Sequence, residues 1–393
     1  MTLKAWLSCF AALVVSAAAQ AQDVVKVGVM MSQTGPFALF GEQQRRGMEL
    51  YLDEVAGRCG TARIELIYRD EAGGPDKAKT LTQELIVRDK VHFLTGFNLT
   101  PTAFAIAPLV TEAKVPTLIT VAGAGSITRR SPYIARVSFT LWQHAVPLAE
   151  WAARNGIKEL VIAYSDYAAG TDTRDGFRAA YQKAGGKVLA ELAMPLQTQD
   201  YAVYVQKIRD MKAGAVFFFA PTGPAGTNFI KTFHAMGLPQ SGVKLITTAA
   251  VDEMELGNMG EQALGAISVW HYSAHLDTPE NKRFVTQWRK KYPQAGLPTF
   301  MDVTAYDGMH AICDVVRKLG GKFDGDQAMN ALKGWTSSTS ARGPIQIDPV
   351  ERDIVQNLYV RRVEKLPAGG YGNVAFETMT AVKDPWKVMN PPQ

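Results

Sequence analysis

Few residues of this chain combine the types and the spacing that chemistry needs. His271 and His275 are four positions apart, the spacing of two metal ligands on one helix, but their segment reads as an extended link with no third ligand, which favours a role at the surface or in a crossover. Gly123-Ala124-Gly125 lacks the third glycine and the lysine of a nucleotide loop. Ser126 has no neighbouring base, and no Gly-x-Ser-x-Gly motif occurs. The sequence therefore predicts binding rather than catalysis, with no metal and no cofactor.

Hydroxyl and backbone N–H groups gather instead after the first predicted strand. The apolar run Val24 to Met31 ends in Ser32-Gln33-Thr34-Gly35-Pro36, and an amphipathic helix pattern begins near Gly41 and continues past Tyr51. Strand, loop and helix in this order form the first unit of a parallel α/β sheet. Small molecules bind beyond the carboxyl ends of such strands, so Thr34 to Phe40 is the first place to look for a site.

The alternation of strands and helices occurs twice along the chain. Four strands and three helices alternate up to residue 121, and a second series follows the helix that begins at 141. After a strand at 266–270 come three helices and two tail strands, at 280–291, 304–319, 327–332, 343–348 and 353–363. We therefore predict an α/β fold of two doubly wound parallel-sheet lobes with more than one crossing between them. The expected division is 23–140 and 273–338 for lobe one, and 141–272 and 339–393 for lobe two.

The first 22 residues have the pattern of a secretory signal peptide: Lys4, an apolar core from Ala5 to Val15, and small residues to Ala21. No later segment has about eighteen consecutive apolar residues, the length of a membrane span. The formal net charge of +5 is mild, and the basic residues are scattered, which argues against nucleic-acid binding. We expect an exported protein.

Two cysteines, Cys59 and Cys313, lie outside the expected signal peptide. An oxidising compartment permits a disulfide between them, but the sequence supplies no geometry for it. Cys313 lies in a helical pattern with Ala311, Ile312 and Val315, which favours a buried apolar role. The sequence leaves the pairing open.

An ordered set of motifs runs along the chain: Thr34-Gly35-Pro36, Phe40-Gly41, Asp70-Glu71, Gly96 to Thr100, Ala122-Gly123-Ala124-Gly125 and Asp166 to Asp172. This set resembles the periplasmic solute-binding proteins of the leucine/isoleucine/valine type, which feed ABC importers. The resemblance covers essentially the whole mature chain and implies two lobes, linked by three crossovers, that close on a small ligand. It implies a monomeric periplasmic binding protein with an inner-membrane permease as partner; an enzyme using the same cleft and a ligand-sensing subunit are the alternatives.

The resemblance also implies ligand-binding roles where the motifs align. It places an aromatic wall at Phe40, and at Thr100 a hydroxyl that binds a ligand carboxylate beside the backbone N–H groups of Ala122 to Ala124. A helix that begins near Thr100 favours an anion through its free N–H groups and its dipole, although a helix N-cap is the alternative role for this threonine. Lobe two is expected to close over the ligand with the segment Asp166 to Asp172, which contains the candidate site residues Tyr167 and Ala169.

The chain departs from the amino-acid binders of this family at two positions. Ala249 replaces the acid that holds the ligand ammonium, and Thr222 replaces an aromatic hydroxyl. A buried ammonium without a carboxylate costs several kcal/mol, so we expect an aromatic carboxylate as the ligand, with a branched-chain amino acid or an amide as alternatives. Asp252 could supply the missing acid if its loop is shifted. Further wall candidates, each of which could equally pack in the core, are Trp142, Tyr167, Trp270 and Tyr272.

Overall fold

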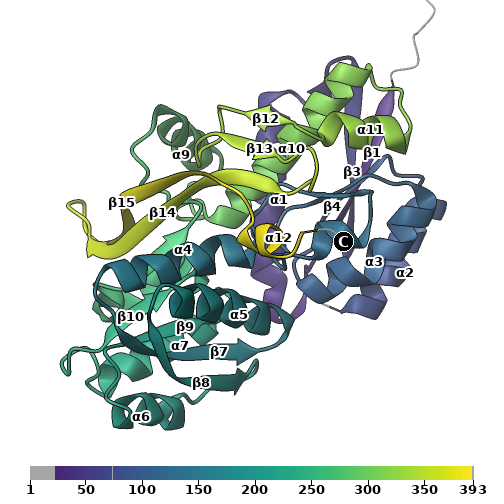
Figure 1. Ribbon diagram of the computed structural model, residues 1–393. Helices are drawn as coiled ribbons and strands as arrows, with labels where there is room; N and C mark the ends of the chain where they lie inside the picture. The colour runs from purple at the N-terminus through teal and green to yellow at the C-terminus, as the bar shows by residue number, and fades with distance from the viewer. Residues whose placement is uncertain (1–22, 73, 392–393) are drawn as a thin grey trace, which may run out of the picture.

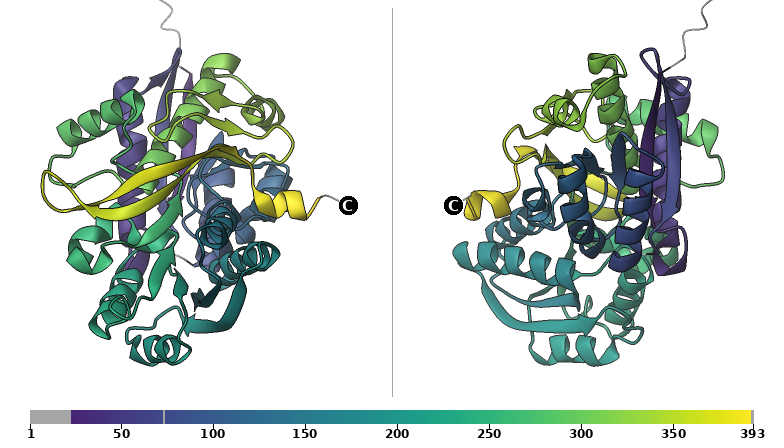
Figure 2. Two further views of the ribbon diagram at one scale, coloured as in Figure 1. Left: turned by 60° about the vertical axis from the view of Figure 1, so that its left-hand side comes forward. Right: turned by 90° about the vertical axis from the view of Figure 1, so that its right-hand side faces the viewer.

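The computed structural model describes residues 23–72 and 74–391, and the predicted signal peptide lies outside them. Figure 1 shows two α/β lobes, one around the purple and blue strands and one around the teal strands. The yellow hairpin of β14 (Ile354–Lys365) and β15 (Tyr371–Val382) lies across the middle of the molecule in Figure 1 and in the left view of Figure 2. The predicted α/β fold of two sheets is confirmed.

A six-stranded sheet forms the centre of lobe one, in the order β2-β3-β1-β4-β5-β6. β1 is parallel to β3 and β4 on either side of it, and β2 is antiparallel to β3. The side chains of β1 alternate between two core clusters, with Val27 and Val29 in one and Met30 in the other, so both faces of the sheet are buried. The strands are β1 (Val24–Met31), β2 (Arg58–Cys59), β3 (Ala62–Asp70), β4 (Phe93–Gly96), β5 (Thr117–Ile119) and β6 (Ile134–Arg136).

Helices cover both faces of this sheet. α1 (Ala38–Glu54) and α10 (Phe300–Leu319) contribute to the cluster of Val27, and α2 (Pro75–Val87) and α3 (Thr100–Ala113) to the cluster of Met30. α1 and α10 pack so closely that a Cβ at Gly47 would lie 2.0 Å from the Asp302 carbonyl oxygen, so only glycine fits there. α9 (Pro279–Lys291) and α11 (Gly325–Leu332) pack beside α10.

The sheet of lobe two runs in the order β12-β13-β14-β11-β10-β9-β7-β8, with β15 paired to β14. Strands β7 to β11 are mutually parallel, and β14 is antiparallel to β11. The strands are β7 (Glu159–Asp166), β8 (Lys187–Pro195), β9 (Ala215–Phe219), β10 (Lys244–Thr247), β11 (Ile267–Trp270), β12 (Thr336–Ser337) and β13 (Ile345–Ile347). The helices are α4 (Leu141–Arg154), α5 (Ala168–Lys183), α6 (Ala202–Asp210), α7 (Pro224–Ala235) and α8 (Glu253–Met259).

The chain passes between the lobes three times: from β6 to α4, from β11 to α9, and from α11 to β12. This agrees with the three crossovers that the family resemblance implies. α10 packs on α1, and β12 and β13 join the sheet of lobe two, so the return to lobe one after β11 takes place as expected. The exact residue boundaries of the lobes remain a prediction.

A fully buried arginine, Arg342, forms hydrogen bonds to the first crossing and to both lobes. Its Nε donates to Asp307 Oδ2 of α10 at 2.8 Å, and its Nη1 donates to the Ser138 carbonyl oxygen of the first crossing at 2.8 Å. The remaining N–H groups reach the Val137 carbonyl oxygen and Gln356 of β14. A buried cation is tolerated only when its N–H groups are satisfied, so these contacts hold both lobes to one point near the crossings.

The tail of the chain contains more structure than its sequence predicts. Two strands are expected at 343–348 and 353–363, and β13 and β14 are present there, but β15 and the short helix α12 (Pro385–Met389) were missed. β15 pairs only with β14 and is largely half-exposed or exposed, so its side chains carry little of the apolar alternation that marks a buried strand.

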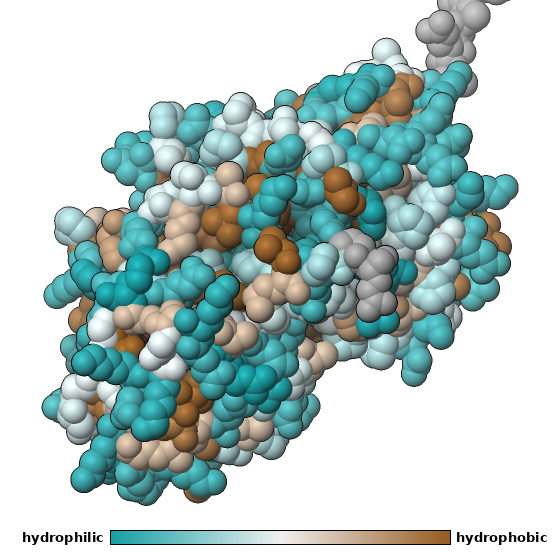
Figure 3. Space-filling view, viewed as in Figure 1, coloured by the Kyte–Doolittle hydropathy of each residue, from teal (hydrophilic) through white to brown (hydrophobic). Residues whose placement is uncertain are grey.

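Figure 3 shows a mostly hydrophilic face, with hydrophobic side chains in small separate groups. Within residues 23–72 and 74–391, no helix combines the length and the apolar character that crossing a membrane requires.

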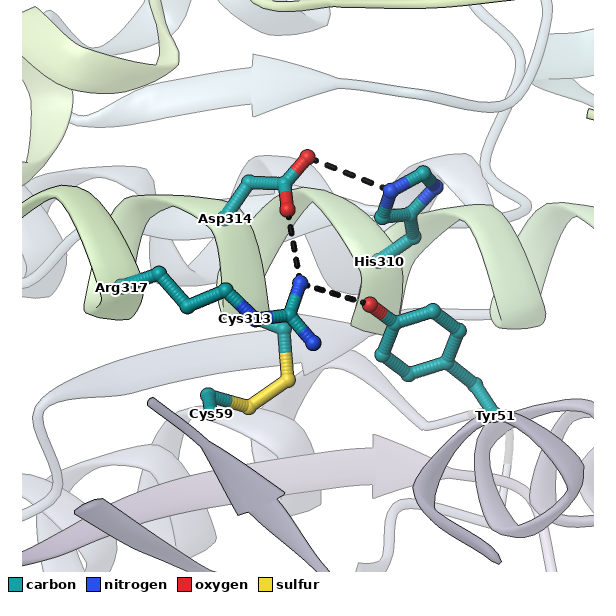
Figure 4. Close-up of a disulfide and its surroundings, with 6 residues drawn as sticks. All are labelled: Tyr51, Cys59, His310, Cys313, Asp314 and Arg317. Carbon is teal, nitrogen blue, oxygen red and sulfur yellow. Dashed lines mark hydrogen bonds and ion pairs between the residues drawn. A yellow bond between two sulfur atoms is a disulfide. The ribbon is translucent and has the colours of Figure 1, made fainter. Parts of the chain in front are cut away.

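A disulfide joins Cys59 of β2 to Cys313 of α10, with their Cα atoms 4.9 Å apart (Figure 4). The expectation that Cys313 is merely a buried apolar residue was therefore wrong: the residue is fully buried, but it is bonded. Beside the disulfide, Arg317 Nη1 donates to Tyr51 of α1 at 3.1 Å and to Asp314 at 2.8 Å. The bond closes a loop of 254 residues that contains all of the second α/β series, and so ties the returning α10 covalently to the start of the chain.

Replacing both cysteines (Cys59→Ala with Cys313→Ala) should lower the free energy of unfolding by about 2–5 kcal/mol, because the unfolded chain regains the freedom that the long loop removes. Urea denaturation with and without reductant measures the effect. The reductant should destabilise the parent protein and leave the double variant unchanged. Equal stability of the oxidised parent and the double variant would contradict a stabilising disulfide.

Candidate functional site

A cavity of about 60 Å³ lies between the two lobes. Every segment that borders it, apart from α1 and α10, lies at or just beyond the carboxyl end of a strand, so the carboxyl ends of both sheets face each other across it. The bordering residues are Phe40, Asn98, Leu99, Thr100, Val121, Gly123, Phe139, Leu141, Tyr167, Ala169, Phe219, Pro221, Thr222, Ala249, Trp270, Phe300 and Met301.

A larger hollow of about 700 Å³ lies at the opposite, amino-terminal ends of β10 and β11, beside Trp151 and Phe233. None of the described side chains that line it carries a buried polar atom without a partner. The interlobe cavity has three such atoms, Asn98 Nδ2, Thr100 Oγ1 and Trp270 Nε1. Buried polar groups are almost always paired, so unpaired donors beside a cavity indicate a ligand site.

Six aromatic side chains border the cavity: Phe40, Phe139, Tyr167, Phe219, Trp270 and Phe300. Phe139 lies edge-on to Phe300, with ring centroids 5.7 Å apart, and Tyr167 stacks on Phe219 at 6.4 Å. The sequence pointed to Phe40, Tyr167 and Trp270. It missed Phe139, Phe219 and Phe300, because nothing in the chain near these residues distinguishes a wall residue from a core residue.

Thr100 is the first residue of α3, and its buried hydroxyl has no partner. The N-cap position belongs to Leu99, and no side chain caps the helix, so the alternative role of Thr100 as an N-cap does not apply. The first turn of a helix has backbone N–H groups without intrahelical acceptors, and the helix dipole makes this end positive. Thr100 therefore lies where an anion would be stabilised.

Asn98 is a site residue that the sequence analysis missed. It lies two positions before Thr100 and is buried, and its amide is held by a short chain of hydrogen bonds: Gln44 Nε2 donates to Asn98 Oδ1 at 2.7 Å, and Thr120 Oγ1 donates to Gln44 Oε1 at 2.5 Å. The Asn98 Nδ2 group has no partner. The sequence signal was its place directly after β4, in the loop that leads to Thr100.

The predicted row of backbone N–H groups at Ala122 to Ala124 needs correction. Gly123 borders the cavity, but Ala122 and Ala124 do not. The Ala122 N–H already donates to the Phe97 carbonyl oxygen at 3.0 Å, and the carbonyl oxygens of Ala122 and Ala124 accept from Arg136 Nη1 at 3.0 and 2.9 Å. These N–H and carbonyl groups are therefore hydrogen-bonded within lobe one.

Two aromatic residues that were predicted to line the site lie away from the cavity. Trp142 packs on Gly176 of α5 and donates from Nε1 to Asp172 at 2.9 Å, and Tyr272 donates its hydroxyl to Asn281 at 3.0 Å. Neither borders the cavity. Of the first candidate loop, Thr34 to Phe40, only Phe40 borders the cavity. The hydroxyl of Thr34 donates instead to Asp70 at 2.7 Å.

The lobe-two side of the cavity contains the predicted Tyr167, Ala169, Thr222 and Ala249. Thr222 Oγ1 donates to the Ala249 carbonyl oxygen at 3.2 Å, so this hydroxyl is already paired. Asp252 does not border the cavity; it caps α8 and accepts the Met254 N–H at 3.3 Å. No charged side chain of the described residues lines the cavity.

The histidines of the sequence analysis belong to the second crossing. His271 follows β11 and is fully buried, and its Nδ1 lies 3.0 Å from His144 Nε2 of α4. Burial lowers the pKa of both imidazoles well below their usual value. Across the described part of the chain, no three His, Cys, Asp or Glu side chains are grouped to hold a metal ion.

Comparisons with known proteins agree with this geometry. A family model described as periplasmic binding protein matches residues 24–370. The chain belongs to this family. It is 39% identical to Leu/Ile/Val-binding protein homolog 6 of Brucella melitensis over 383 residues, 96% of this chain and 97% of that protein.

Two solved structures have the same fold at a TM-score of 0.89. One is a solute-binding protein of an ABC transporter from Rhodopseudomonas palustris BisB5 in complex with 3,4-dihydroxybenzoic acid, 43% identical, covering 93% of this chain and 99% of that one. The other is an R. palustris solute-binding protein in complex with 4-hydroxybenzoate, 40% identical, covering 93% of this chain and 100% of that one. The fold and the family are thereby established.

Glu71 lies behind the α3 end of the cavity, where it accepts the Asn98 backbone N–H at 3.0 Å. Burial raises the pKa of this carboxyl to about 7. In the unfolded chain the pKa of a glutamate is about 4.3, so this group destabilises the folded protein progressively as the pH rises from about 4 to 7, and the full effect persists above that range.

Glu71→Gln should therefore become more stable relative to the parent protein as the pH rises, because glutamine can still accept the Asn98 N–H but cannot ionise. The difference in free energy of unfolding between variant and parent should grow by about 2 kcal/mol from pH 5 to pH 8. Urea denaturation of both proteins at the two pH values measures it. A difference that stays constant with pH would mean that Glu71 keeps an ordinary pKa.

Proposed function

We propose that this chain is the extracytoplasmic solute-binding component of an ABC importer, and that it binds a small aromatic carboxylate between its lobes. One observation carries the proposal: unpaired hydrogen-bond donors lie beside six aromatic rings in a cavity without charged side chains. The rings suit a flat apolar ligand, and the donors at the start of α3 suit its carboxylate. The aromatic acids bound by the two R. palustris proteins have this combination of groups.

The lining makes a branched-chain amino acid the weaker candidate. Its ammonium would need a carboxylate partner, and the family resemblance implies that Ala249, which borders the cavity, replaces the acid of the amino-acid binders. Asp252 is held at the start of α8. Burying an ammonium without a partner leaves an uncompensated charge at a cost of several kcal/mol.

The cavity volume supports a hinge motion. A cavity of about 150 Å³ accommodates benzene in a well-studied case, whereas this cavity has a volume of about 60 Å³. An aromatic acid therefore needs more room than this conformation offers, and the lobes must move apart to admit it. Ligand contacts to both lobes would stabilise the closed form, which a membrane permease can then recognise.

The proposal includes a periplasmic location after removal of residues 1–22, action as a monomer, and no catalytic activity. It is supported by the family membership and by the likeness to solute-binding proteins of ABC transporters.

Isothermal titration with benzoate, 4-hydroxybenzoate, leucine and valine tests the ligand class. The aromatic acids should bind and should raise the melting temperature with concentration, because a ligand that binds only the folded state stabilises it by mass action. Tight binding of leucine or valine, without binding of either aromatic acid, would refute the proposed ligand.

Thr100→Val should weaken benzoate binding at least tenfold, because the variant keeps the shape of threonine and removes a donor to a charged group, worth about 1.5–3 kcal/mol. Thr222→Val is the matched control. Its hydroxyl already donates to Ala249, so its loss should change the affinity much less. Equal effects of the two variants would exclude the proposed role of Thr100.

A further inference from the structure

We propose that Asn98 is a second ligand-binding donor, which selects an anionic carboxylate, and that Gln44 positions it. This inference rests on the proposed function. It concerns a residue that the family resemblance did not assign, and it explains how a cavity without a cationic side chain can recognise an acid.

The orientation of the Asn98 amide carries the argument. Its Oδ1 accepts from Gln44 Nε2 at 2.7 Å, and its backbone N–H is bound to Glu71 Oε1 at 3.0 Å. Gln44 is held in turn, because its Oε1 accepts the Thr120 hydroxyl hydrogen. With the oxygen of the Asn98 amide engaged, the group left without a partner is Nδ2, which can only donate.

The burial of this donor indicates that it has a partner in the bound state. Asn98 is 3% exposed and borders the cavity, and leaving a buried donor unpaired is unfavourable because the donor has lost its hydrogen bonds to water. A carboxylate has two oxygens that accept hydrogen bonds. Thr100 Oγ1 can donate to one oxygen and Asn98 Nδ2 to the other, since Asn98 lies in the loop that leads into α3, Thr100 is the first residue of that helix, and both border the cavity.

Neutral donors have an advantage over a buried arginine or lysine at this place. A cation in this apolar cavity would be uncompensated whenever no anion is bound, whereas an amide and a hydroxyl lose only hydrogen bonds. The helix dipole of α3 supplies the remaining stabilisation of the anion. The wall of the cavity can therefore remain apolar for the ring.

The test compares benzoate with benzamide, which has nearly the same shape but replaces one acceptor oxygen by an NH₂ group. A donor that selects the anion should make the parent protein prefer benzoate. The preference is the dissociation constant of benzamide divided by that of benzoate, and Asn98→Leu should reduce this ratio about tenfold. General damage to the site would weaken the binding of both ligands equally and leave the ratio unchanged.

Gln44→Leu is the second variant, and it leaves Asn98 in place. Loss of the Gln44 Nε2 donor frees the Asn98 amide to turn, so the preference for benzoate should fall several-fold. This variant keeps the inference testable if Asn98→Leu does not fold.

Asn373→Leu is the matched control for the replacement of a buried asparagine. Asn373 is fully buried, donates to the Val251 carbonyl oxygen at 2.7 Å and does not border the cavity. Its replacement should lower the melting temperature without changing the ratio of the dissociation constants.

Three outcomes separate the claims. A lower ratio of the dissociation constants in the Asn98 and Gln44 variants, and not in the Asn373 variant, supports the inference. An unchanged preference for benzoate in the Asn98 and Gln44 variants overturns it and leaves the proposed function standing. A parent protein that binds neither benzoate nor any other aromatic acid overturns the proposed function and this inference together.

Discussion

The position of the two lobes depends on the buried guanidinium of Arg342. Its hydrogen bonds are complete only when the first crossing, α10 and β14 meet at one point. A buried cation with missing partners is costly, so these segments are held together. Phe139, the residue after Ser138 in that crossing, is thereby held against the cavity. The same contacts that join the lobes therefore place part of the ligand wall.

The buried charged side chains near the crossings do not border the cavity. Arg136 and Arg342 are fully buried near the crossings and are paired with carboxylates, whereas the cavity itself is lined by rings, small residues and neutral donors. This arrangement separates two tasks. Ion pairs hold the framework, and the apolar lining remains free to accept a ring. The small volume of the cavity couples ligand entry to movement of the lobes.

The sequence predicted the elements better than the site. Most strands and helices of both α/β series were found because buried parallel strands and amphipathic helices have strong periodic patterns, whereas the short elements β2 and α8 were missed. Seven of the ten predicted site residues border the cavity: Phe40, Thr100, Gly123, Tyr167, Ala169, Thr222 and Ala249. Apart from Phe40, which lies in α1, each lies within a few residues of the end of a strand and could be found by its place in the chain. The three predictions that failed are Ala122, Ala124 and Trp142. Each is the direct neighbour of a residue that borders the cavity, and neighbouring residues point in different directions, so these three face the core instead.

By itself the sequence determined the fold class, the two lobes and the loops from which a site would be built, since these follow from local periodicity and chain order. Only the tertiary structure decided which side chains share the cavity. Phe139, Phe219 and Phe300 come from three distant segments, and the orientation of Asn98 depends on Gln44 and Thr120, 54 and 22 positions away in the chain (98 − 44 and 120 − 98). The disulfide of Cys59 and Cys313 was left open for the same reason: distances between remote residues arise from packing and carry no local signal.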